Sequence, residues 1–193
     1  RQLSEAQGSR TGRGGIIPLI LLWLVWLLLL TAAARPLWIG EAIELPNSGR
    51  DLMMAVDISG SMQIEDMQVG QSLVSRMKAV RQLGADFIGQ RAGDRLGLIL
   101  FGTKAYVQSP LTFDTATVKR FLLEAQIGFA GKETAIGDAI GLAVKRLKDQ
   151  PAESRVLILL TDGQDTASSV KPLDAAKLAA SLGIRIYTIG IGA

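Results

Sequence analysis

The chain has 193 residues, and neither cysteine nor histidine occurs among them. Disulfides, thiolate metal sites, histidine zinc sites and Ser-His-Asp hydrolysis are therefore excluded. The formal net charge is +3, but residues 1–35 carry four arginines and one glutamate, so the charges of the remaining residues cancel. The basic balance belongs to one end of the chain, and no nucleic-acid partner is indicated.

The first segment, residues 1–15, is polar and rich in glycine, which predicts a loop or tail rather than a folded unit. The chain begins with Arg1 instead of methionine, and we expect the natural protein to start further upstream.

Residues 16–34, IIPLILLWLVWLLLLTAAA, contain no charged side chain. As a helix this stretch would reach about 28 Å, enough to cross the hydrocarbon core of a bilayer. A secretory signal peptide that is cleaved after residues 32–34 is the alternative, but its apolar core would be shorter. We therefore predict a transmembrane helix over residues 16–34, followed by a linker over residues 35–50.

The arginines around this apolar stretch indicate its orientation. Arg1, Arg10 and Arg13 precede it, whereas Arg35 and Arg50 follow it. The positive-inside rule then places the N-terminal side in the cytoplasm and the main domain across the membrane.

Beyond residue 50, short apolar runs alternate with amphipathic segments. The runs at 52–56, 95–101, 155–160 and 185–191 predict strands that are buried on both faces. Residues 105–111 follow a Gly-Thr-Lys turn and predict an antiparallel edge strand, where Pro110 is tolerated.

Helices are predicted between these strands from apolar residues that share one helical face. The three sets are Leu73, Met77, Val80, Leu83 and Phe87; then Val118, Phe121, Leu122 and Ala125; then Ile136, Ile140, Val144 and Leu147. A further helix is predicted from Pro172 to about residue 182, before Gly183.

The alternation predicts an α/β fold: a doubly wound, Rossmann-like, mostly parallel sheet with helices on both faces and one antiparallel edge strand. A sheet of this kind normally adds a helix after its last strand. We therefore expect the domain of residues 51–193 to be truncated at its C-terminal end.

Oxygen-bearing side chains gather where two of the predicted strands end. The sequence DISGSM places Asp57, Ser59 and Ser61 directly after the first strand, and Asp162 follows the strand at 155–160. Ligands bind at the carboxyl ends of strands in doubly wound sheets, so the two acids would face one crevice if their strands are neighbours. Thr134 lies in the loop before a helix and is a third contributor.

These three segments resemble the metal-ion-dependent adhesion site of von Willebrand factor A domains. The match comprises DISGS at 57–61, Thr134 in its Gly-x-x-Thr-Ala-Ile-Gly setting, and Thr-Asp-Gly at 161–163. The apolar stretch, the RPLW linker and the closing IYTIGIGA resemble bacterial aerotolerance-type (Bat-like) membrane proteins.

The resemblance implies that Ser59, Ser61 and Thr134 supply hydroxyl ligands to a divalent cation. Asp57 and Asp162 would reach the cation directly or through water. Mg²⁺ prefers such hard oxygen ligands, and Mn²⁺ is the alternative. Neutral hydroxyls leave the cation under-neutralised, so the carboxylate of a protein partner could complete its coordination.

The implied function is metal-dependent protein–protein interaction by a membrane-anchored domain that is not an enzyme. The Bat-like resemblance further implies an association with related membrane proteins and a MoxR-type AAA+ ATPase, in stress or aerotolerance. With the orientation above, it also implies that the protein is located in the bacterial inner membrane and that its main domain lies in the periplasm.

Three alternatives stay open at this point. The serines and Thr134 could each cap a helix. A haloacid-dehalogenase-like phosphotransfer enzyme could use Asp57 as its nucleophile, but it needs a second aspartate where this chain has Ser59. The domain could also be structural, with a vestigial site. Other polar residues near the expected rim, Glu65, Asp66, Asp165, Lys132 and Asp138, are interpreted as solvated or capping side chains.

Overall fold

A computed structural model describes residues 15–34, 49–70 and 72–192. The chain divides into two units, residues 1–45 and 46–193. Most of the predicted polar segment and of the predicted linker lies outside the described residues. The first unit contains helix α1, Ile16–Ala34, which has a mean hydropathy of 2.6 and is long enough and apolar enough to cross a membrane. Its bounds agree with the predicted stretch, and its insertion in a membrane stays a prediction.

The second unit is built on a five-stranded sheet with the order β5-β4-β1-β6-β7. The parallel strands are β1, Asp51–Asp57; β4, Arg95–Phe101; β6, Arg155–Thr161; and β7, Arg185–Gly190. Strand β5, Ala105–Thr112, pairs antiparallel with β4 at the edge. The predicted doubly wound sheet with one antiparallel edge strand is therefore confirmed.

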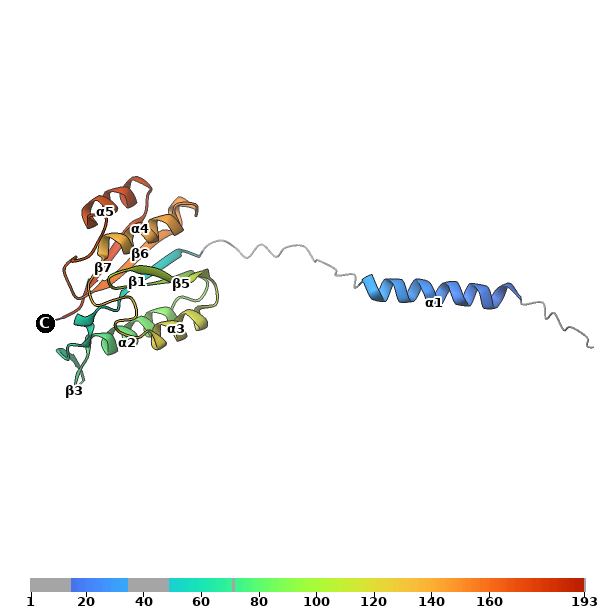
Figure 1. The fold of residues 1–193 in the computed structure, drawn as a ribbon, viewed down its shortest axis with the longest axis horizontal. Coiled ribbons are helices and arrows are strands. Elements are labelled where there is room, and N and C mark those ends of the chain that lie inside the picture. Colours follow the sequence, from blue (N-terminus) through green and yellow to red (C-terminus); the bar gives the residue numbers. More distant parts are fainter. Residues whose placement is uncertain (1–14, 35–48, 71, 193) are drawn as a thin grey trace, which may run out of the picture. The chain divides into compact units, whose positions relative to one another are not determined.

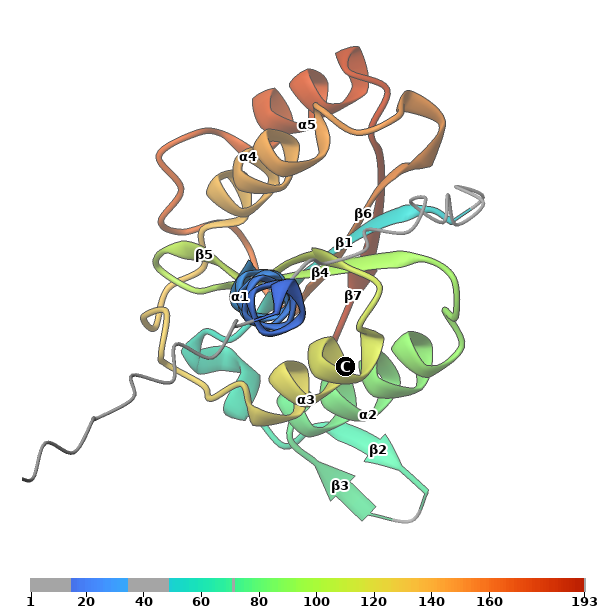
Figure 2. The same ribbon diagram turned by 90° about the vertical axis from the view of Figure 1, so that its right-hand side faces the viewer.

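Helices cover both faces of this sheet (Figures 1 and 2). Helices α2, Arg76–Gly89, and α3, Thr115–Glu124, lie on one face, and α4, Ile136–Leu147, and α5, Pro172–Ser181, lie on the other. The central strand β1 alternates between the two cores, with Leu52, Met54 and Val56 toward α2 and α3, and Met53 and Ala55 toward α4 and α5. This alternation explains why the sequence of β1 is apolar without interruption.

One apolar position of the first predicted helix was assigned wrongly, and another is not buried. Leu73 belongs to strand β3, Ser72–Val74, which pairs with β2, Met67–Val69, in a small hairpin. The helix starts later because Ser75 caps it, its hydroxyl accepting a hydrogen bond from the N–H of Lys78. Leu83 does lie in α2, but its side chain is exposed.

Two short 3₁₀ helices, η1 (Gly60–Gln63) and η2 (Ala152–Ser154), complete the described elements.

Strand β7 departs from the prediction that both its faces are buried. Tyr187 and Ile189 are exposed on the face that turns toward α2, although the neighbouring strand β6 is buried. Helix α5 packs on the opposite face of the sheet, where Ile186 joins the core with α4 and α5. The apolar sequence of β7 therefore indicates a strand correctly but not the burial of its second face.

Candidate metal centre

The candidate site lies at the carboxyl ends of β1 and β6. The two strands are hydrogen-bonded neighbours, with Val56 opposite Leu160. Asp57 is the last residue of β1, and Asp162 follows the end of β6. The sheet therefore brings together the two acids that the sequence placed at strand ends.

Asp57 is 0% exposed and is held in one orientation by two hydrogen bonds. Its Oδ1 accepts a bond of 2.8 Å from the N–H of Ser59, and its Oδ2 accepts one of 2.8 Å from the hydroxyl of Thr161. Burial raises the pKa of the Asp57 carboxyl, the bonds from Ser59 and Thr161 oppose this, and the charge of Asp162 adds to the rise. The negative charge of Asp57 is thus costly to bury in the absence of a cation.

The two serines connect these acids through a row of oxygen atoms. The hydroxyls of Ser59 and Ser61 lie 3.0 Å apart. Ser61 donates a hydrogen bond of 2.8 Å to Oδ1 of Asp162, whose side chain is fully buried. Four of the five predicted site residues, Asp57, Ser59, Ser61 and Asp162, therefore share one polar cluster.

Thr134, the fifth predicted residue, is buried in the loop before α4. Its Oγ1 lies 3.7 Å from the position that a Cβ atom would take at Gly163, so it faces the turn that begins with Asp162. Its backbone is fixed to the same turn, because the N–H of Thr134 donates to the Thr166 hydroxyl over 3.0 Å and its carbonyl accepts from the N–H of Thr166 over 2.8 Å. The loop of Thr134 is also joined to η1, where the N–H of Gly60 donates to the carbonyl of Lys132.

The hydroxyls do not act as helix caps, so that alternative is wrong. Ser59 occupies the N-cap position of η1, but its side chain makes no capping bond. The N-cap residue of α4 is Ala135, not Thr134. The first N–H groups of α4 are satisfied by Asp165 and Ser168 instead. The three predicted hydroxyls are therefore left available for another role.

Arg76 is a member of the site that the sequence did not reveal. Its Nη1 lies 3.0 Å from Oδ2 of Asp162, and its Nε lies 3.0 Å from both carboxylate oxygens of Asp66. Asp66, followed by Asp162, raises the pKa of the Arg76 guanidinium above its usual value. Arg76 is distant from Asp162 in the sequence, and no local pattern links the two residues.

The remaining rim residues have structural roles or remain exposed. Oδ1 of Asp165 accepts a bond from the N–H of Ile136, and Oδ1 of Asp138 accepts bonds from the N–H groups of Ser169 and Val170. Glu65 and Lys132 are exposed. The interpretation of Asp165 as a solvated loop residue is therefore wrong, because it binds the first turn of α4, and Asp138 fixes the loop at Ser169 and Val170 instead of capping its own helix.

The donor set fits a hard divalent cation. Across residues 15–34, 49–70 and 72–192, no three histidine, cysteine, aspartate or glutamate side chains are placed so that together they could hold a metal ion. The site instead offers two carboxylates and three hydroxyls, and the Thr134 hydroxyl has no hydrogen-bond partner among these described residues. Mg²⁺ and Mn²⁺ accept all-oxygen ligands of this kind, whereas softer metals prefer nitrogen and sulfur.

Comparison with known proteins agrees with this fold and shows the family of the chain. Residues 51–193 match the von Willebrand factor type A domain family. A serine-substituted aerotolerance-related membrane protein of Bacteroides fragilis is 32% identical, with a TM-score of 0.67 over 75% of this chain and 68% of that one. A membrane-spanning protein of Vibrio fischeri is 49% identical, with a TM-score of 0.51 over 74% of this chain and 70% of that one.

A curated relative from Borreliella burgdorferi is 30% identical over 171 residues, which are 89% of this chain. The chain spans about half, 49%, of the length of that relative. A more distant structure, proximal thread matrix protein 1 of the mussel byssus with a zinc-occupied adhesion motif, shares the fold at 18% identity, with a TM-score of 0.59 over 74% of this chain and 38% of that one.

Proposed function

This chain belongs to the von Willebrand factor type A domain family, and we propose that it binds a divalent cation and uses the cation to dock a protein partner. The proposed ligands are Asp57, Ser59, Ser61, Thr134 and Asp162. The observation that carries the proposal is the buried cluster of two strand-end carboxylates and three hydroxyls that cap no helix.

The chemistry of this cluster favours binding over catalysis. The hydroxyls of Ser59, Ser61 and Thr134 would supply neutral oxygen ligands, and the two carboxylates would supply the negative charge. A cation in such a site keeps part of its positive charge, so it can accept one more carboxylate, offered by a partner. We infer Mg²⁺ or Mn²⁺ as the resident ion, because both prefer oxygen ligands.

The phosphotransfer alternative receives no support from the site. Both oxygens of the Asp57 carboxylate accept hydrogen bonds and the residue is 0% exposed, so it is poorly placed to attack a substrate. Ser59 also stands where such an enzyme would need an acid for the leaving group. A vestigial site would be expected to have lost ligands, but all five predicted residues are present and four are joined by hydrogen bonds.

We further propose that α1 anchors the domain in the bacterial inner membrane, with the domain in the periplasm. The similarity to aerotolerance-related membrane proteins supports a role of this domain in a membrane-associated complex. A MoxR-type AAA+ ATPase is the partner that this resemblance suggests, in a stress or aerotolerance response.

The test of the cation site is calorimetric titration and thermal unfolding of the protein with Mg²⁺, Mn²⁺ or EDTA. A cation at a hundredfold excess over its Kd should stabilise the fold by about 2.7 kcal/mol. Asp57→Ala should abolish this gain, and Ser59→Ala and Thr134→Ala should reduce it. Asp165→Asn is the matched control, because Asp165 lies on the same rim but serves α4 through the N–H of Ile136.

The test of docking is capture of membrane proteins by the wild type and by Asp57→Ala, each with Mg²⁺ and with EDTA. A partner that is retained only by the wild type with cation supports the proposal. If neither cation shifts the unfolding of the wild type, the shared site is wrong. If cation binds but capture is unchanged by EDTA, the role in docking is wrong.

A further inference from the structure

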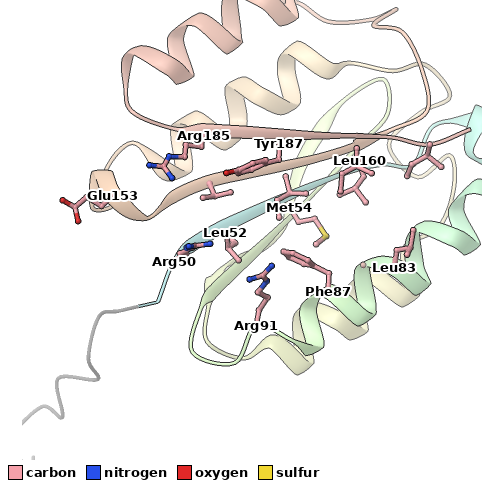
Figure 3. A pocket seen from close by; sticks show the side chains of 15 residues that line it. Arg50, Leu52, Met54, Leu83, Phe87, Arg91, Glu153, Leu160, Arg185 and Tyr187 are labelled. Atoms are coloured by element: carbon pink, nitrogen blue, oxygen red, sulfur yellow. The ribbon is translucent and has the colours of Figure 1, made fainter.

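The face of the sheet that α2 and α3 cover is hollowed at both edges. A wide groove lies between α2 and β7, and three arginines and one glutamate gather at one end of it: Arg50, Arg91, Arg185 and Glu153 (Figure 3). A second hollow, of about 400 Å³, lies at the opposite edge between α3 and β5. Its charge has the opposite sign, because Glu124 is the one charged side chain among the described residues that line it.

Three aromatic side chains line this second hollow. Tyr106 comes from β5, Phe121 from α3 and Phe129 from the loop that follows α3. Tyr106 and Phe121 are half-buried and pack against the core, whereas Phe129 is 76% exposed. The face of an aromatic ring is the negative part of its quadrupole and attracts cations.

The exposed ring of Phe129 is carried by a tight turn. Gly128 and Gly131 have φ angles of 83° and 96°, which favour glycine, and the N–H of Gly131 donates to the carbonyl of Gly128 over 3.0 Å. The N–H of Lys104 donates to the carbonyl of Ala130 over 3.0 Å and fixes the turn to the β4–β5 connection. A phenylalanine fixed in solvent adds little to the stability of the fold, so we interpret it as a contact residue.

The polar groups of the hollow can accept hydrogen bonds from a cation. Glu124 offers a carboxylate, Gln108 and Gln126 offer amide oxygens, and Tyr106 offers its hydroxyl. Within residues 15–34, 49–70 and 72–192, these four side chains have no hydrogen-bond or ion-pair partner.

The hollow also lies at the C-terminal end of α3, whose last residue is Glu124. This end is the negative pole of the helix dipole and favours a positive charge. Arg81 of α2, which does not line the hollow, donates a hydrogen bond to the carbonyl of Ala125. The end of α3 therefore already binds one guanidinium.

We propose that this hollow binds an arginine side chain of a protein partner. A guanidinium is planar, stacks on aromatic faces and carries five N–H donors, which suits three rings beside one carboxylate and two amide oxygens. A lysine ammonium is compact and strongly hydrated, so it matches the rings less well.

The loop after α3 joins this hollow to the candidate metal centre. The N–H of Gly128 donates to the carbonyl of Ile58 over 2.8 Å, and the N–H of Gly60 donates to the carbonyl of Lys132 over 3.1 Å. Ile58 and Gly60 flank Ser59, one of the proposed ligands. One partner can then offer a carboxylate to the cation and an arginine to the hollow. This link rests on the proposed docking function, whereas the arginine site itself does not.

The experiment titrates the chain, in detergent micelles with EDTA, with N-acetyl-arginine amide and follows the ring signals of ¹³C-labelled phenylalanine by NMR. The chain has five phenylalanines. The signals of Phe121 and Phe129 should shift with one common Kd, whereas that of Phe113, which is exposed outside the hollow, should not. N-acetyl-citrulline amide, the neutral analogue, should bind at least roughly threefold more weakly because it lacks the charge.

Phe129→Leu and Glu124→Gln should each weaken the binding of the arginine probe by roughly threefold or more. Both replaced side chains are exposed, so the fold should be kept. Glu133→Gln removes an exposed acid outside the lining and should leave the Kd unchanged. Equal binding of the arginine and citrulline probes, equal shifts of all five rings, or an unchanged Kd in both Phe129→Leu and Glu124→Gln would overturn the proposal.

Peptides that carry one aspartate and one arginine at increasing separations test the link to the metal centre. With Mg²⁺, one separation should give binding at least roughly tenfold tighter than the same peptide with citrulline for arginine or asparagine for aspartate. An arginine effect that persists in EDTA, without any aspartate effect in Mg²⁺, would support the hollow and overturn the proposed docking function. An aspartate effect in Mg²⁺ without any arginine effect would overturn the hollow alone.

Discussion

Nη1 of Arg76 lies 3.0 Å from Oδ2 of Asp162, so a permanent positive charge contacts one of the two carboxylates of the proposed cation site. The Asp162 side chain is fully buried, and that of Arg76 is 14% exposed. In the metal-free protein Arg76 compensates a carboxylate that would otherwise be buried without a partner. In the metal-bound protein the same guanidinium would lie close to the cation and repel it.

Replacing Arg76 with glutamine should therefore increase the affinity for Mg²⁺ and decrease the stability in EDTA. We expect a gain in affinity of roughly fivefold or more, equivalent to about 1 kcal/mol. Calorimetric titration at constant ionic strength and urea unfolding in EDTA measure the two effects. Lys78→Gln on the same helix removes an exposed charge and should change neither quantity. A weaker affinity in Arg76→Gln would mean that Arg76 orients Asp162 for the cation instead of opposing it.

Asp57→Asn should be as stable as the wild type in EDTA or more stable, and its advantage should depend on pH. Burial raises the pKa of Asp57 above 3.8, so the carboxyl binds a proton more tightly in the folded wild type than in the unfolded chain. The wild type therefore loses stability relative to Asp57→Asn as the pH rises from about 3.8 through this higher pKa, and the difference is constant at higher pH. Denaturant unfolding in EDTA over this pH range measures the difference.

The order of stability of the wild type and Asp57→Asn should reverse when Mg²⁺ is saturating at neutral pH, because only the wild type keeps the full ligand set. Unfolding profiles that stay parallel at all pH values in EDTA would show that the Asp57 charge is not costly in the folded protein.

Two glycines of α4 should respond in opposite ways to alanine. A Cβ atom at Gly137 would lie 1.8 Å from the carbonyl oxygen of Val170, in the loop that follows Asp162, whereas no atom lies within 4 Å of a Cβ at Gly141. Gly137→Ala should therefore cost about 1–3 kcal/mol of stability. Gly141→Ala should stabilise the fold by about 0.5–1 kcal/mol, because alanine is the better helix former. Urea unfolding of the pair checks this, and equal effects would contradict the close packing of Val170 on α4.

The proposed topology can be tested with alkaline phosphatase fused after Ala193. The arginines before α1 predict an active, periplasmic fusion that sediments with the membrane fraction. A fusion before residue 16 should be inactive and serves as the control. An inactive C-terminal fusion would reverse the orientation. Release of an active fusion into the soluble periplasm would identify residues 16–34 as a cleaved signal peptide.

Local sequence patterns were sufficient for most of the fold. The bounds of β4 and α4 agree with prediction because an apolar run and a helical apolar face report directly on burial. Leu73 was misassigned because its spacing from Met77 also suits a helix, while its pairing with Gln68 in the hairpin is a contact that periodicity does not encode. Leu83 follows the helical pattern of a core residue, but its side chain is 58% exposed.

The five candidate ligands could be named from the sequence because strand-end acids and the short motifs that resemble the adhesion site are local features. The sequence by itself thus determined the fold class, the apolar helix of residues 16–34 and the candidate residues of the site. Only the tertiary structure decided that β1 and β6 are neighbours, which brings Ser61 to Asp162 across 101 positions. It also placed Arg76 on Asp162 from 86 positions away and left one face of β7 uncovered. The physical reason is that these contacts depend on strand order and helix placement, which many distant residues set together, whereas periodicity reports only the burial of each segment.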